Sequence, residues 1–286
     1  MKKNSIKKKD SIAKPKGKIG VLIPGIGGAV STTFIAGLEA VKQGLAKPFG
    51  SLTQMGTIRL GKRDEHRVPM IKDFINLASL RDLMFCGWDV YEDNCYDGAI
   101  KAGVLERSLI ESVKYPLQQL KPLPAVFRKE FVKNLDGTNI KKQKKHLELV
   151  EALKDDIKSF KKINDIDRCI MIWCASTETY LAPQNVHSSI AAFEKGLKKN
   201  DPAISPSMLY AYAAITSGIP YINGSPSLTV DIPAMVQLAK KHEVPISGKD
   251  FKTGQTLMKT ILAPGLKRSE ERRVGKECRS RWSPYH

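Results

Sequence analysis

The stretch Lys18-Ile19-Gly20-Val21-Leu22-Ile23-Pro24-Gly25-Ile26-Gly27-Gly28 decides the fold of this chain. Residues 19–23 are apolar and mostly β-branched, which predicts a short buried strand. The glycines that follow predict a tight turn. Apolar residues then recur at helical spacing over 32–45, which predicts a helix. The chain therefore opens on a strand, a glycine turn and a helix.

The same alternation of strand and helix continues along the sequence. Apolar runs predict further strands at 83–90, 169–174 and 244–246. Patterns of helical period predict helices at 101–114, 141–162, 207–216 and 232–242. Near-continuous apolar strands separated by helices indicate a parallel sheet covered on both faces. We predict an α/β fold with a Rossmann-like, doubly wound parallel sheet.

The glycine turn has the sequence context of a dinucleotide-binding site, between a strand and a helix. Gly25 would make the turn, and Gly27 would let the backbone approach a diphosphate, which main-chain amides and the helix dipole would hold. Ser31, Thr32 and Thr33 can cap the helix or donate to a phosphate. The spacing is G-x-G-G, however, with Val30 in place of a third glycine, so a turn without a ligand is the alternative.

Asp89 is the candidate for binding the adenosine ribose. An acidic residue usually follows the second strand of such a unit, and Asp89 ends the predicted strand at 83–90. Its alternative role is a helix cap or a turn residue. The long insertion between the two strands, 45–80, would be a family-specific excursion.

Composition and charge exclude several classes of protein. With 42% hydrophobic and 27% charged residues, the chain is neither disordered throughout nor collagen-like. No run approaches the roughly 20 apolar residues that span a bilayer, so no membrane association is expected. Five cysteines without metal-ligand spacing indicate no metal site and no disulfide scaffold, and they favour the cytoplasm.

The net charge of +18 is concentrated at the ends and in one helix. Residues 1–18 hold eight lysines and one aspartate, and a further lysine-rich stretch lies within 141–162. Such a charge could bind nucleic acid. We favour a disordered basic tail at 1–17 and a solvated helix face, because the helix lacks the interleaved aromatic residues that stack on bases. No nucleic-acid partner is expected.

Five motifs in order resemble the inositol-3-phosphate synthase (myo-inositol-1-phosphate synthase) family. Trp173-Cys174-Ala175-Ser176-Thr177-Glu178-Thr179-Tyr180 is similar to the family's W-T-A-N-T-E-R-Y motif. Asn223-Gly224-Ser225-Pro226 matches N-G-S-P, and 248–256 is similar to G-D-D-F-K-S-G-Q-T. The glycine turn and Gly87-Trp88-Asp89 complete the set. The resemblance covers 18–267 and is closest to the shorter prokaryotic members.

The resemblance implies an NAD-dependent isomerisation of D-glucose 6-phosphate to 1D-myo-inositol 3-phosphate, in inositol and phospholipid biosynthesis. Bound NAD would oxidise C5, enolisation and an intramolecular aldol reaction would join C6 to C1, and the same cofactor would reduce the ketone. It also implies a homotetramer. The alternatives are another Rossmann-type sugar oxidoreductase and a basic nucleic-acid-binding protein.

By the same resemblance, the residues that would bind NAD fall into three groups. Those at the phosphates and the ribose are Gly25, Ile26, Gly27, Gly28, Ala29 and Asp89. Those after a sheet strand are Ala175, Ser176 and Thr177, and those toward the nicotinamide are Gly224, Ser225, Asp250 and Thr253. Their alternative roles are ordinary turns and helix caps. The chain departs from the family at Ala29-Val30, where longer members have two asparagines, and at Ser176, Thr179 and Leu257.

Family members continue well beyond the point that matches Lys267, through a tetramerisation and catalytic domain that supplies the catalytic lysines. We therefore assign no catalytic residue, and give none of that role to Lys252 or Lys259. We expect 18–267 to be the NAD-binding domain with the start of the catalytic domain, most of which would be missing. Residues 268–286 would be a non-family tail, either disordered or artefactual, so this fragment could be inactive.

Overall fold

The first compact unit of the chain, Met1–Lys249, contains a six-stranded parallel sheet in the order β3-β2-β1-β4-β5-β6. The structure is a computed structural model that describes residues 16–251 and 254–268. The strands are β1 (Lys18–Pro24), β2 (Leu83–Asp89), β3 (Leu123–Pro124), β4 (Ile166–Trp173), β5 (Tyr221–Asn223) and β6 (Ile246–Gly248). The chain winds outward from β1 to β3 and then returns to the other side of β1 at β4. This confirms the prediction of a doubly wound sheet.

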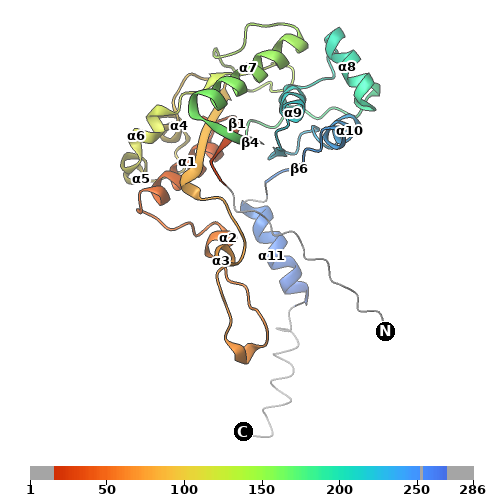
Figure 1. Cartoon of the computed structure of the whole chain (residues 1–286). Helices are drawn as coiled ribbons and strands as arrows, with labels where there is room; N and C mark the ends of the chain where they lie inside the picture. Colours follow the sequence, from red (N-terminus) through yellow and green to blue (C-terminus); the bar gives the residue numbers. More distant parts are fainter. Residues whose placement is uncertain (1–15, 252–253, 269–286) are drawn as a thin grey trace, which may run out of the picture. The chain divides into compact units, whose positions relative to one another are not determined.

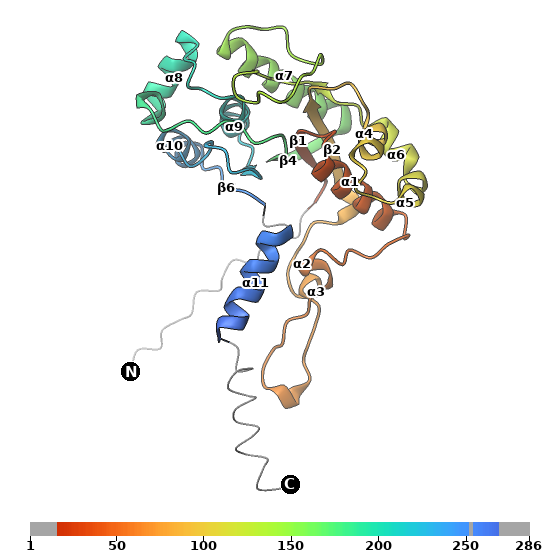
Figure 2. The ribbon, with the colours of Figure 1, turned by 180° about the vertical axis from the view of Figure 1, so that it is seen from behind.

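Alternating side chains of the strands enter two separate cores, one on each face. Val21 and Ile23 pack into one core and Leu22 into the other. Helices cover both faces, as Figures 1 and 2 show. The face of Val21 is covered by α1 (Ala29–Lys42), α4 (Cys95–Ala102), α5 (Arg107–Ser112) and α6 (Lys114–Gln119). The face of Leu22 is covered by α7 (His146–Asn164), α8 (Ile190–Lys199), α9 (Pro206–Thr216) and α10 (Pro233–His242).

One helix prediction was wrong. The predicted helix at 101–114 straddles the end of α4, all of α5 and the first residue of α6. Gly103 ends α4 in the left-handed conformation, with φ of 62°, and so breaks the helical period. Smaller differences are that α1 begins three residues before its predicted position, β4 three residues before, α7 five residues after and β6 two residues after.

The insertion at 45–80 forms an arm that leaves the sheet, as Figure 1 shows. It contains α2 (Leu52–Met55), the 3-10 turn η1 (Arg63–Glu65) and α3 (Ile71–Phe74). A single antiparallel bridge between Thr57 and Met70 joins its two sides. None of these short elements contains a buried residue, so the arm packs little apolar surface.

The second unit, Asp250–His286, contains α11 (Gly254–Arg268). Most of the predicted basic tail at 1–17 and almost all of the tail at 268–286 lie outside the described residues. The predicted domain limits therefore stay a prediction. No helix in the described part of the chain is both long and apolar enough to span a membrane.

Candidate cofactor-binding site

The glycine turn lies at the carboxyl end of β1, between the ends of β2 and β4. The amide of Gly25 donates to the carbonyl oxygen of Trp88 in β2 at 2.7 Å. On the other side, the amide of Cys174 donates to the carbonyl oxygen of Pro24 at 3.0 Å. The order of winding reverses between β1 and β4, and in open α/β sheets ligands bind in the crevice at this point.

A side chain would collide with its surroundings at Gly25 and would be tightly confined at Gly27. Gly25 has φ of 85°, and a Cβ atom there would lie 2.6 Å from the main chain of Ala175. A Cβ atom on Gly27 would lie 3.1 Å from Oδ2 of Asp89. The absence of side chains thus lets three segments meet at one point. The predicted approach of Gly27 to a diphosphate stays a prediction.

The main-chain amides of the turn itself are largely used within the protein. Gly25 and Ile26 both donate to Trp88, Gly27 donates to Oδ2 of Asp89 at 2.9 Å, and Gly28 donates to the carbonyl of Gly25. The next three amides, at 29–31, open α1 and have no acceptor within the helix. Residues 28–30 are exposed. The helix N-terminus, rather than the glycine amides, therefore offers the donors for a diphosphate.

Asp89 lies beside this helix N-terminus. Burial raises the pKa of its carboxyl group, and the hydrogen bonds from the amides of Gly27 and Tyr91 oppose that rise. A carboxylate offers about four acceptor positions. Two are occupied, so the others remain for hydroxyl groups such as those of a ribose. Asn139 supports the position by donating to the main-chain carbonyl of Asp89 at 3.0 Å.

The loops after β4 and β5 lie at the same edge of the sheet. Ala175 is half-buried against Gly25, while Ser176 and Thr177 are exposed. The amide of Gly224 donates to the carbonyl of Trp173 at 3.1 Å, which joins the two loops. The Ser225 hydroxyl is buried among polar partners, so its predicted contact with the nicotinamide would come from the main chain.

The last two predicted residues are not part of this edge as described. Asp250 belongs to the second unit, with φ of 68°. Thr253 lies outside the described residues. Their contacts with NAD stay a prediction.

Glu178 is a residue that the sequence did not single out. It is 5% exposed, and its carboxylate accepts hydrogen bonds from the amide and the hydroxyl of Ser207, at 2.7 and 2.6 Å. Burial raises the pKa of Glu178, and these hydrogen bonds oppose the rise. The signal was present in the sequence as an acidic residue directly after the pair Ser176-Thr177. Its partner, 29 residues away, could not be predicted.

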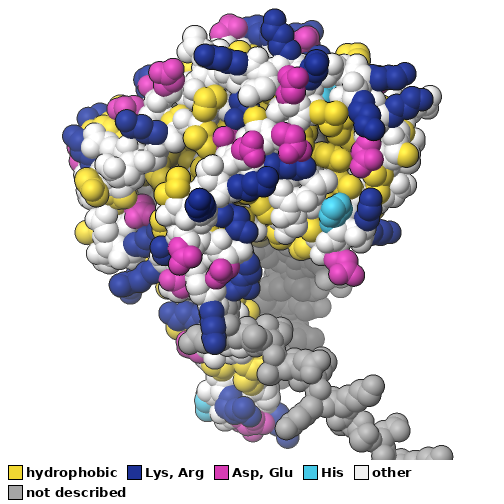
Figure 3. All heavy atoms as spheres, turned by 45° about the horizontal axis from the view of Figure 1, so that its top comes forward, with side chains coloured by type: hydrophobic (Ala, Val, Ile, Leu, Met, Phe, Trp, Pro, Cys, Tyr) yellow, Lys and Arg dark blue, Asp and Glu magenta, His cyan; other side chains and the backbone are white. Residues whose placement is uncertain are grey.

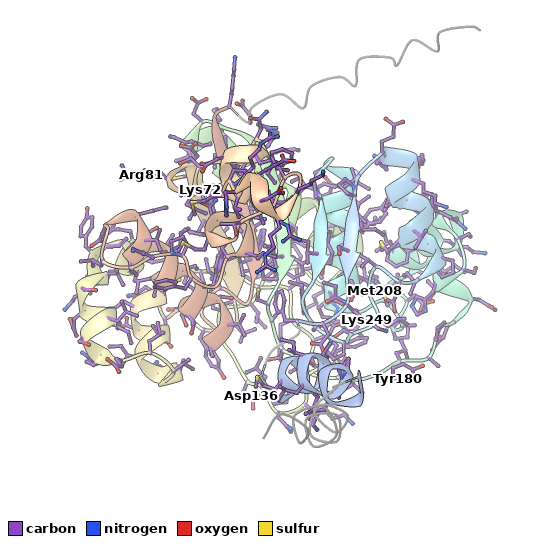
Figure 4. All side chains as sticks on the ribbon, turned by 90° about the horizontal axis from the view of Figure 1, so that it is seen from below. Lys72, Arg81, Asp136, Tyr180, Met208 and Lys249 are labelled. Carbon is purple, nitrogen blue, oxygen red and sulfur yellow. The ribbon has the colours of Figure 1, made fainter. Side chains whose placement is uncertain are left out.

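Two other kinds of functional site, a metal site and a separate cavity, are the alternatives to this edge of the sheet. Among residues 16–251 and 254–268, no group of three His, Cys, Asp or Glu side chains could hold a metal ion. A cavity of about 410 Å³ is lined by Lys42, Lys72 and Arg81 among others, but it lies at the amino ends of the strands. Figure 4 shows Lys72 and Arg81 well away from Tyr180, Met208 and Lys249, which follow β4, begin α9 and follow β6.

The winding order and the glycine turn at its reversal define a dinucleotide-binding α/β protein. A family model of an NAD-binding domain, described as myo-inositol-1-phosphate synthase, matches residues 19–266. The chain belongs to the myo-inositol-1-phosphate synthase family, and the matched region is its NAD-binding domain.

Individual relatives agree with this membership. Inositol-3-phosphate synthase 1 of Bacteroides thetaiotaomicron is 48% identical over 260 residues, which are 91% of this chain and 60% of that protein. The rice inositol-3-phosphate synthase 1 is 35% identical over 87% of this chain and 52% of its own length. The crystal structure of the Caenorhabditis elegans inositol-3-phosphate synthase superposes with a TM-score of 0.80 at 29% identity, covering 87% of this chain and 53% of that one. The chain thus spans between half and three fifths of these relatives, and nothing in the comparisons supports the two alternative functions.

Proposed function

We propose that this chain is the NAD-binding part of an inositol-3-phosphate synthase, which isomerises D-glucose 6-phosphate to 1D-myo-inositol 3-phosphate. The observation that carries the proposal is the exposed start of α1 at 28–30 beside the half-buried carboxylate of Asp89, at the reversal of the sheet. The names of the relatives supply the reaction. The geometry of this edge supports the proposed place of the cofactor.

The residues at this edge suit the parts of NAD in turn. The amides at 29–31 and the positive end of the α1 dipole would hold the diphosphate. Asp89 would accept hydrogen bonds from the adenosine ribose. The exposed main chain at 175–177, with Gly224 next to it, would line the path toward the nicotinamide.

NAD supplies the hydride chemistry of the reaction, while the protein supplies orientation and exclusion of water. No catalytic residue is assigned within the described part of the chain. We propose further that glucose 6-phosphate is the substrate and that the whole family enzyme is a homotetramer. A reducing compartment, the cytoplasm, is supported by the four described cysteines, all of which are free thiols.

Thermal unfolding of the 286-residue chain with and without NAD tests the cofactor site. At 100 times the dissociation constant, NAD stabilises the folded state by about 2.7 kcal/mol. For a chain of this size that raises the unfolding temperature by about 5–10 °C. No shift at millimolar NAD would overturn the proposal. Formation of inositol phosphate from glucose 6-phosphate, followed by phosphorus NMR, tests the reaction separately.

A further inference from the structure

The buried polar side chains next to the cofactor edge form one connected network. The carboxylate of Glu178 accepts from Ser207 at the first turn of α9, and the Ser207 hydroxyl also bonds to that of Thr229 at 2.8 Å. The main-chain amide of Glu178 donates to the hydroxyl of Ser227 at 3.0 Å. Ser227 in turn accepts from the Ser225 hydroxyl at 2.9 Å. Glu178 therefore joins the loop after β4 to the loop after β5, through Ser227 and, by way of Ser207, through Thr229.

The network also fixes the turn that carries Gly224. Asn223, which ends β5, donates from its side-chain amide to the carbonyl of Ser227 at 2.9 Å. Its side-chain oxygen accepts from both the amide and the hydroxyl of Ser225 at 3.1 Å. All of these side chains are buried. The turn is consequently held from inside by hydrogen bonds among its own buried side chains.

A further branch reaches the end of the first unit. The amide of Thr229 donates to Asp231 at 3.0 Å, and Asp231 forms an ion pair with Lys249 at 2.9 Å. Lys249 directly precedes Asp250. The network thus extends from the loop after β4 to the last residue of the first unit.

Glu178 fixes the far end of the exposed segment 175–177, because it directly follows Thr177 and its carboxylate is held by Ser207. The near end is fixed by the hydrogen bond from Cys174 to Pro24 in β1. A buried carboxylate is costly unless it is hydrogen-bonded, and this one has its donors at the N-terminus of a long helix, where a negative charge is stabilised.

We propose that Glu178 is a positioning residue for NAD, which sets the loop after β4 and the turn after β5 in register with each other. This inference rests on the proposed function, since it assumes that both segments contact the cofactor. Glu178 does not touch the cofactor itself. Its effect is to preorganise two loops, which lowers the ordering cost of binding.

The test measures the dissociation constant of NAD by calorimetry on folded protein, with circular dichroism confirming the fold at the temperature used. Glu178→Ala removes the acceptor of α9 and should weaken NAD binding about tenfold or more. Glu178→Gln keeps an acceptor for the Ser207 amide, and its amide group can donate to the Ser207 hydroxyl. It should restore affinity to within about threefold of the unchanged chain.

Two further variants separate positioning from stability. Ser227→Ala removes the hydroxyl that accepts from the Glu178 amide and from the Ser225 hydroxyl. It should also weaken NAD binding, so it decides the matter if Glu178→Ala does not fold. Leu197→Ala removes buried apolar contacts in α8 and should lower the unfolding temperature with NAD affinity unchanged. Hydrogen exchange in the peptide 174–180 should be faster in the Glu178→Ala and Ser227→Ala variants.

The outcomes are distinct. A folded Glu178→Ala or Ser227→Ala variant that binds NAD as tightly as the unchanged chain overturns the inference and leaves the proposed function standing. An unchanged chain that does not bind NAD overturns both.

Discussion

Position 25 imposes two requirements that only glycine meets. Its φ of 85° lies in the left-handed region, and the space beside its Cα is filled by the main chain of Ala175. Backbone atoms cannot move aside as the end of a flexible side chain can. The position therefore couples the local conformation of the turn to the distance between β1 and β4.

We expect Gly25→Ala to lower the free energy of unfolding by about 3 kcal/mol or more, because it adds a collision to an unfavourable φ. Gly218→Ala is the matched control, since Gly218 has φ of 71° but nothing within 4 Å of its Cβ position. It should cost only about 1 kcal/mol. Urea unfolding measures both changes. Equal losses in the two variants would show that the contact with Ala175 matters little.

Asp89 should make stability depend on pH. Because burial raises the pKa of its carboxyl group above the ordinary 3.8, the folded state holds the proton more tightly than the unfolded state. The resulting stabilisation is present below pH 3.8 and is lost as the pH rises through the raised value.

The Asp89→Asn variant cannot titrate at this position. The unchanged chain should therefore gain stability relative to the variant as the pH falls from 7 toward 4. Urea unfolding at several pH values measures this difference. A difference that stays constant across the range would contradict the assignment to Asp89.

At the level of single residues, sequence predicted positions better than partners. The turn at Gly25 and the neighbouring position of Asp89 followed from the ends of two adjacent parallel strands. The hydrogen bonds from Gly27 to Asp89 and from Ser207 to Glu178 could not be predicted, because their partners are far apart along the chain. That the amides of the glycine turn already donate to acceptors within the protein could likewise be learned only from the structure.

The helix α7 shows why a lysine-rich stretch need not bind an anion. Lys141 and Asp156 form an ion pair of 2.6 Å with side chains only 8% and 22% exposed. Lys145, Lys154 and Lys158 have acidic partners three residues away along the helix. Figure 3 shows basic and acidic side chains interspersed over the face turned toward the viewer. Four of the lysines in this stretch are thus paired with nearby carboxylates.

Asp156 is also the anchor of α7 on the sheet, because the indole nitrogen of Trp88 in β2 donates to its carboxylate at 2.7 Å. Asp156→Ala would leave Lys141 and Trp88 without this partner. We expect it to lower the free energy of unfolding by about 2–3 kcal/mol. The control is Asp155→Ala, whose pair with Lys158 is more than 70% exposed and should be worth less than about 1 kcal/mol. Similar losses in urea unfolding would argue against the anchoring role.

Whole elements were predictable where their period was long and regular. The observed bounds of α9, α10, β1 and β2 lie within one residue of the predicted ones. α7 begins five residues after its predicted start and β4 three residues before. The strand β5 has only three residues, too few to show a period. The helices α4 to α6 are short and are separated by single breaks, which the apolar pattern alone does not reveal.

For the molecule as a whole, we expect the lysines at the N-terminus to contribute to polyanion binding but not to NAD binding. Residues 1–15 contain six lysines and one aspartate, and the described residues begin at Lys16. Deleting them should leave the dissociation constant of NAD unchanged and greatly weaken any retention on heparin. Retention at unchanged salt concentration would instead assign polyanion binding to the folded part, and a weaker NAD affinity would contradict the separation.

The hydrogen bond between Gly27 and Asp89 bears on selectivity between related cofactors. NADP carries an additional phosphate on the adenosine ribose, at the place where Asp89 would accept hydroxyl groups. That phosphate would bring two negative charges against a carboxylate that the glycine turn holds in place. Because the carboxylate is anchored from both Gly27 and Tyr91, it could not swing away, and NADP would be rejected by the turn itself.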